Sequence, residues 1–162
     1  QNTFYEWINS GVKRECQDCH MGQGGHSFPG GYDIDFVRAA ITLSVIKKNN
    51  TLEVSLQSKN IGHALPTGDP FRRLTWILCL DKACDNVIAT KTFSVLHQGP
   101  AWHVERDERL FPNQSRDFVM TDIMNNNELW WELNYYYGDP YLEKYLNDKD
   151  IVAIIYKGKI TN

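Results

Sequence analysis

From residue 36 onward the chain consists of short runs in which apolar and polar side chains alternate, and this pattern limits its fold more than any other feature. In VRAAITLSVI (37–46) apolar residues recur at every second position, which is the period of a half-buried strand. Asn49 and Asn50 predict a turn and LEVSLQ (52–57) alternates again, so the two runs predict a β-hairpin. Further strands are predicted over 73–80, 86–96, 116–124, 130–137 and 151–160. Strands at this spacing indicate a mainly β fold, an immunoglobulin-like β-sandwich.

The first 35 residues differ from the rest. Apolar residues at near-helical spacing predict one helix over 3–20, and the Gly, Ser and Pro residues of 22–35 predict a loop that can lie close to a flat ligand. A short helix is predicted over 140–148, before the last strand. We therefore expect a helix and loop over 1–35 and a sandwich domain over 36–162.

Charge and hydropathy argue against nucleic acid as a partner and against a transmembrane helix. The net charge of −3 provides no basic field for nucleic acid, and no apolar run reaches the length of about 18 residues that a transmembrane helix needs. A chain that begins at Gln1 is typical of a processed or truncated protein, so we expect any signal peptide to lie outside this sequence.

The motif with the most specific chemistry is Cys16-Gln17-Asp18-Cys19-His20. C-x-x-C-H is the attachment motif of c-type haem. Two thiols about one helical turn apart face the same side, where they can add to the two haem vinyl groups. His20 then lies under the iron and offers an imidazole nitrogen.

Three other interpretations of this motif compete with haem attachment. A thioredoxin-like redox pair requires a βαβ setting, whereas this pair is expected on a helix before a β-domain. A structural zinc site requires further Cys or His ligands at finger spacing. A plain disulfide leaves His20 without a role, so the sequence favours haem c.

The second cysteine pair, Cys79 and Cys84, flanks a short segment of turn composition between two apolar strands. We expect a disulfide that closes the end of this hairpin. A reactive thiol is the alternative, but no histidine lies nearby in sequence to lower a cysteine pKa.

Haem iron needs a ligand opposite His20 unless the site is open for chemistry. His63 lies in a Gly- and Pro-rich loop that could present it from the β-domain, and His26 lies within reach if the chain curls round the porphyrin edge. His97 and His103 are expected in a surface loop and are weaker candidates. Met120 and Met124 are further candidates.

Four stretches together resemble the C-terminal module of periplasmic and extracellular multihaem cytochromes c. They are FYEWINSGVKRECQDCHM, HSFPGG, NIGHALPTGDPFRRLTW and RDERLFPNQ, and they span most of residues 4–118. The resemblance implies electron transfer with bis-histidine ligation, in which Cys16 and Cys19 form the thioethers and His20 is the proximal ligand. His63 and His26 both match family histidines; we favour His63 as the sixth ligand and keep His26 as the alternative.

Arginines form a second group of candidates, because guanidinium groups bind carboxylates such as haem propionates through two hydrogen bonds. Arg73 and Arg109 are the chosen candidates, from a set that also holds Arg72 and Arg106. The alternative is a structural ion pair of an arginine with Asp107 or Glu108 inside the sandwich.

The resulting hypothesis is a monohaem c-type cytochrome domain that is not an enzyme and that transfers single electrons in the periplasm or outside the cell. Its expected partners are redox proteins such as other cytochromes, and an oligomer or a larger multihaem assembly stays open. Two alternatives remain: a haem enzyme or gas sensor with an open sixth site, and a sandwich for docking or adhesion in which haem is accessory.

Overall fold

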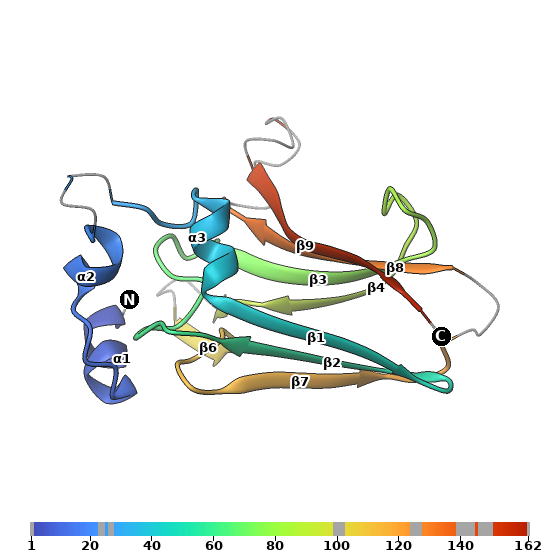
Figure 1. The fold of residues 1–162 in the computed structure, drawn as a ribbon, viewed down its shortest axis with the longest axis horizontal. Helices are drawn as coiled ribbons and strands as arrows, with labels where there is room; N and C mark the ends of the chain where they lie inside the picture. The colour runs from blue at the N-terminus through green and yellow to red at the C-terminus, as the bar shows by residue number, and fades with distance from the viewer. Residues whose placement is uncertain are drawn as a thin grey trace.

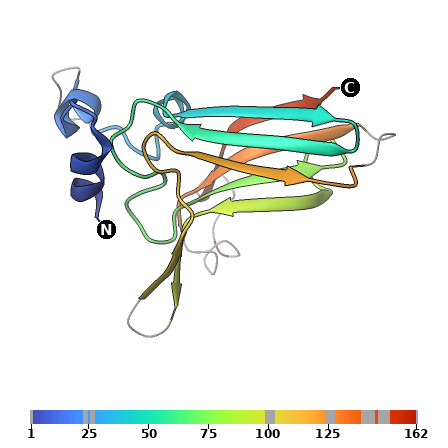
Figure 2. The ribbon, with the colours of Figure 1, turned by 90° about the horizontal axis from the view of Figure 1, so that it is seen from below.

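The computed structural model describes residues 2–22, 25, 28–98, 103–123, 128–138, 145 and 151–161. Its main body is a two-layer β-sandwich, with two short helices set at one end (Figures 1 and 2). The prediction of a mainly β sandwich preceded by a helical segment is confirmed. No described helix has both the length and the apolar character required to cross a membrane.

Every strand pairing in the described chain is antiparallel. One layer has the order β1-β2-β7, made from β1 (Ile41–Lys48), β2 (Thr51–Ser58) and β7 (Ser115–Met120). The other has the order β4-β3-β8-β9, made from β4 (Val87–Phe93), β3 (Arg73–Cys79), β8 (Leu129–Tyr136) and β9 (Val152–Ile160). A third pair, β5 (Val95–Gln98) and β6 (His103–Asp107), forms an arm that leaves the sandwich in Figure 2.

The predicted hairpin at Asn49 and Asn50 is present. Lys48 pairs with Thr51 across the turn, and Asn49 has a φ of 54°, a conformation that asparagine tolerates better than most residues. In β2 the residues Leu52, Val54 and Leu56 are all buried. The alternation read from the sequence is therefore the alternation between the core and the solvent.

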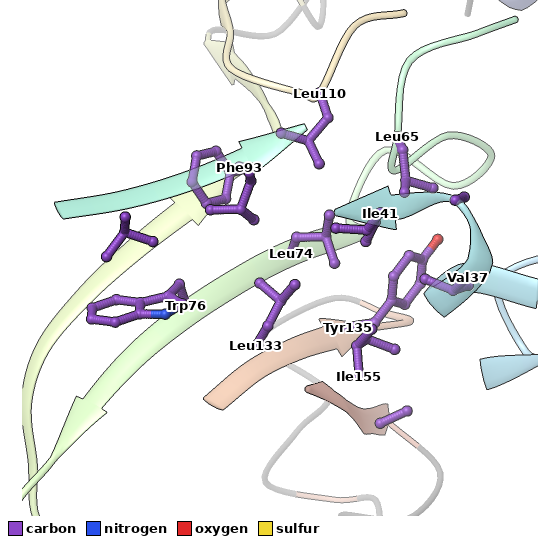
Figure 3. Close-up of a cluster of buried hydrophobic side chains, with 14 of the residues drawn as sticks. Val37, Ile41, Leu65, Leu74, Trp76, Phe93, Leu110, Leu133, Tyr135 and Ile155 are labelled. Atoms are coloured by element: carbon purple, nitrogen blue, oxygen red, sulfur yellow. The ribbon is translucent and has the colours of Figure 1, made fainter. Parts of the chain in front are cut away.

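The core lies between the two layers. Figure 3 shows Leu74 and Trp76 of β3 beside Leu133 of β8, with Phe93 of β4 close by. Trp76 also meets the opposite layer, since its ring contacts Phe118 of β7 edge to face at 5.4 Å between centroids. Burial of such side chains contributes about 1.5–3 kcal/mol each to folding.

The predicted helix over 3–20 is wrong as a single element. The segment forms α1 (Thr3–Ser10) and α2 (Cys16–His20). Gly11 ends α1 in the left-handed conformation, with a φ of 73°, which is the usual stop signal of a helix. Glu15 and Asp18 then start α2 through a reciprocal capping box.

A third helix, α3 (Ile34–Ala39), replaces the end of the predicted loop and the start of the first predicted strand. The Asp33 side chain accepts a hydrogen bond from the Phe36 backbone N–H and so caps this helix. Arg38 donates to backbone carbonyls of Ile154 and Ile155, which fastens α3 to β9. The strand therefore begins only at Ile41.

One further strand prediction and one loop prediction need correction. The stretch 86–96 contains two strands of different sheets, because the chain leaves the four-stranded layer at Ser94 to form the arm. His97 and the backbone of His103 accordingly belong to strands rather than to a surface loop. The helix predicted over 140–148 and Met124 fall outside the described residues, except for Tyr145.

Candidate cofactor site

A cavity of about 1010 Å³ lies where the helical segment meets the end of the sandwich. The loop that follows β2 runs beside α1 at this end (Figures 1 and 2). The cavity is lined from four directions, by α1 and α2, by the chain before and within α3, by the loop after β2, and by Tyr135 of β8. A space of this size is at the upper end of ordinary small-molecule sites.

Helix α2 brings both thiols of the C-x-x-C-H motif to this cavity. Cys16 and Cys19 are three residues apart on one helix and both line the cavity, and neither is in a disulfide. None of the residues of α2 is buried, so the helix depends on its capping box and on contacts of His20 for its position. The thiols are therefore available for a reaction.

The His20 ring is held by the loop that follows it. Its Nδ1 lies 2.5 Å from the backbone oxygen of Pro29, a contact in which the ring nitrogen must be the donor. Phe28 stacks on the ring at 4.3 Å between centroids, and Phe36 of α3 lies at 5.1 Å. With Nδ1 carrying the proton, Nε2 is left with a free lone pair, as a metal ligand requires.

His63, which also lines the cavity, repeats this arrangement. Its Nδ1 donates to the backbone oxygen of Ala64 at 2.9 Å, so in the neutral imidazole the lone pair is on Nε2. The His20 and His63 ring centroids are 6.2 Å apart, and the rings are inclined by only 14°. A metal–imidazole bond of about 2 Å and a ring centre about 1 Å beyond the nitrogen place two axial imidazoles about 6 Å apart. The pair thus has the spacing of ligands on opposite sides of one metal ion.

Helix α1 sets the path of the loop that carries His63. The Glu6 carboxylate accepts the Ala64 backbone N–H at 2.9 Å, and Thr3 and Thr67 share a hydrogen bond between their hydroxyl groups. Trp7 packs so closely on Gly62 that a Cβ there would lie 2.6 Å from the indole. The loop is thus fixed immediately before and after His63.

Arg109 is a sequence-based candidate for contact with a propionate. In the structure it binds Glu6, the residue that holds the loop carrying His63. Its guanidinium contacts Glu6 at 2.7 Å and Asp107 at 2.6 Å, and it is not among the cavity-lining residues. Burial alone would lower the pKa of Arg109, but hydrogen bonds and attraction from Asp107 and Glu6 outweigh it and raise the pKa. The ion pair of an arginine with Asp107 was the alternative that the sequence analysis named. The role of Glu6 was not predicted, since its only signal is a carboxylate within the apolar run FYEWI.

Arg73 also lies apart from the cavity lining. It donates to the backbone oxygen of Gly138 at 3.2 Å and its guanidinium lies 4.1 Å from the Tyr136 ring centroid. Arg72, the neighbour in sequence, does line the cavity. Cys79 and Cys84 form a disulfide at the β3–β4 turn, as expected. His26 lies outside the described residues.

The residues present fit a large, flat, apolar group with a central metal. Within the described chain, His, Cys, Asp and Glu side chains form no group of three that could hold a metal ion alone. Two imidazoles with centroids 6.2 Å apart and two free thiols instead have the residue types of the axial ligands and covalent anchors of haem c. Phe4, Phe28 and Tyr32 line the same cavity and are 62%, 64% and 70% exposed, an apolar surface that such a group would cover.

Comparison with known proteins defines the class of fold. No protein-family model matches the chain, and no curated protein matches it. A crystal structure of a penta-haem cytochrome c552 from Thermochromatium tepidum superposes with a TM-score of 0.76 at 23% identity, over 98% of this chain. The chain spans about half of that protein's chain (50%). At this identity the likeness establishes a shared fold.

Proposed function

We propose that this chain is a c-type cytochrome module that holds one haem covalently and passes single electrons between redox proteins outside the cytoplasm. The observation that carries the proposal is the pair of imidazoles from His20 and His63, 6.2 Å apart beside two free thiols. The likeness in fold to a penta-haem cytochrome supports it independently of the motif.

Each residue of the site has a defined role in this proposal. The Cys16 and Cys19 thiols would anchor haem, each by addition to one vinyl double bond, sulfur to one carbon and hydrogen to the other, so that no oxidant would be consumed. His20 and His63 would hold the iron through Nε2. Haem, when bound, supplies an iron that takes up and releases one electron. The backbone oxygens of Pro29 and Ala64 keep both imidazoles in the ligating tautomer.

Ligation by two imidazoles favours a lower reduction potential than ligation by His and Met, because Met raises the potential. With His20 and His63 as iron ligands, the module would keep no vacant iron site for substrate chemistry. This is the reason to propose electron transfer rather than an enzyme or a gas sensor.

In this proposal residues 1–35 form the haem-attachment segment and 36–162 the sandwich that supplies the second ligand. The partners are redox proteins, in particular other cytochromes, and the module works in the periplasm or outside the cell, as a separate protein, an oligomer or a part of a larger multihaem assembly. Support comes from the single C-x-x-C-H motif and from the multihaem protein with the same fold.

The test begins with the mass of the denatured protein. The proposal requires a mass greater than that of the polypeptide by one haem, whereas the bare polypeptide mass would contradict it. Low-temperature EPR of the oxidised wild type, His63→Ala and His26→Ala then identifies the sixth ligand. We expect a low-spin signal in the wild type and in His26→Ala, and a high-spin signal in His63→Ala. High spin in His26→Ala alone would assign the ligand to His26.

A further inference from the structure

Arg72 lines the cavity, and its side chain is partly buried. Its Nη1 donates to the backbone oxygen of Thr67 at 3.1 Å, and its Cζ lies 5.5 Å from the Tyr32 ring centroid. Its Nε is buried and has no hydrogen-bond partner among the described residues. The guanidinium also makes a side-chain hydrogen bond with Tyr135. Guanidinium groups have five donors in a fixed fork, so the Nε donor remains unused by the described chain.

The charge of Arg72 also has no carboxylate partner among the described residues. Arg38, Arg106 and Arg109 each have a carboxylate within ion-pair distance, but no such pair is found for Arg72 in the part of the chain that the structure describes. Its neighbour Tyr135 does not supply a negative charge, because burial raises the pKa of that phenol to about 12. A partly buried cation without an anion is costly, which indicates that an anion completes this wall.

The wall that contains Arg72 is separate from the one that carries the thiols. Its contacts are with Thr67, Tyr32 and Tyr135, and none of them is with α2. Haem has its vinyl groups and its two propionate carboxylates on different edges, so thiols at one wall leave the carboxylates for another.

We propose that Arg72 binds a propionate carboxylate of the haem, with its Nε among the donors. This inference rests on the proposed function and assigns the anion-binding residue of the same site. Arg14 and Lys59 also line the cavity, but both are exposed, so water screens their charges. A fixed positive charge beside the cofactor favours the state that holds one more electron, so Arg72 raises the reduction potential.

The experiment compares Arg72→Gln and Arg72→Lys with two matched controls, Arg14→Gln and Lys59→Gln. Denatured mass and EPR first establish that haem is attached and low-spin in each. The midpoint potential and the propionate bending band in resonance Raman spectra are then measured. We expect Arg72→Gln to lower the potential and shift the band, and Arg72→Lys to restore most of the potential but not the band, because lysine keeps the charge and loses the fork.

A potential and a band equal to wild type in Arg72→Gln would overturn the inference, as would a larger change in either control. If Arg72→Gln does not fold, Arg72→Lys decides alone, since an unmoved band in that variant overturns the assignment. A wild-type mass without haem would instead remove the proposed function itself, so the two failures are distinct.

Discussion

At the scale of single residues, Gly62 explains why α1 can dock beside His63. A methyl group at this position would lie 2.6 Å from Trp7 Cδ1 and 3.4 Å from Ser10 Oγ. We expect Gly62→Ala to destabilise the protein by about 1–3 kcal/mol, since such overpacking forces the helix away. Gly30→Ala is the control, because no atom lies within 4 Å of its added Cβ. Equal urea midpoints for the two variants would contradict this account.

Arg109 offers a second test at this scale. Its side chain is 10% exposed and that of its partner Glu6 is 9% exposed, so removal of the cation leaves buried carboxylates unpaired. We expect Arg109→Met to cost about 3–5 kcal/mol in the free energy of unfolding, measured by urea denaturation. Arg106→Met should cost at most about 1 kcal/mol, because the side chain of Arg106 is 64% exposed. A similar loss in both variants would contradict the pairing described here.

Single residues also mark the limit of what the sequence could predict. Cys16, Cys19 and His20 were identifiable because their chemistry is encoded in local spacing. The contact of Glu6 with Ala64 and Arg109 joins residues 58 and 103 positions apart, and no local pattern encodes such a pairing. Arg72 lines the cavity and Arg73 does not, and no local pattern in the sequence shows which of the two faces it.

At the scale of elements, the alternation of apolar residues predicted most strands, because burial of one face of a sheet imposes that period. The short helices were missed or merged because capping residues, and not the apolar pattern, determine where they begin and end. Gly11 stops α1 and Asp33 starts α3, although the apolar pattern continues through both positions. The division of 86–96 between two sheets depends on the arm, which is a tertiary feature.

The hairpin of β3 and β4 supports a prediction about its disulfide. Cys79 and Cys84 close a loop with a sequence separation of 5, and a loop this short stabilises the fold by about 2 kcal/mol through the entropy of the unfolded chain. We expect reduced wild type and the Cys79→Ala/Cys84→Ala variant both to melt below oxidised wild type, and only wild type to respond to reductant. The absorption spectrum should not change, since neither cysteine lines the cavity. Equal melting temperatures with and without reductant would count against this estimate.

At the scale of the whole molecule, the sandwich holds the core and the helical segment contributes little to it. Neither α1 nor α2 has a buried residue, whereas both layers and α3 supply the buried cluster. We expect the Cys16→Ala/Cys19→Ala variant, which cannot attach haem, to keep the β-sheet signal in far-ultraviolet circular dichroism. Loss of that signal would show that the sandwich needs the cofactor to fold.

The buried Tyr135 predicts how the folded protein responds to alkali. Burial raises its pKa from 10.0 to about 12, so between these values the unfolded chain loses a proton that the folded chain keeps. Stability contributed by the neutral phenol is therefore complete below pH 10 and falls as the pH rises toward 12, by on the order of 2 kcal/mol. Urea midpoints across this range should fall less steeply in Tyr135→Phe, and as in wild type in Tyr145→Phe, whose ring is exposed. A wild-type slope in Tyr135→Phe would assign the loss to other groups.

The contacts of the two imidazoles with Pro29 and Ala64 have a consequence for how such a module can diverge. Both acceptors are peptide oxygens, which every amino acid provides, so a point mutation at either position does not delete them. The course of the main chain therefore sets the orientation of the two imidazoles, and the neighbouring side chains can change without altering it. Modules of this fold with little sequence in common can therefore keep the same orientation of the two imidazoles for as long as the two loops keep their shape.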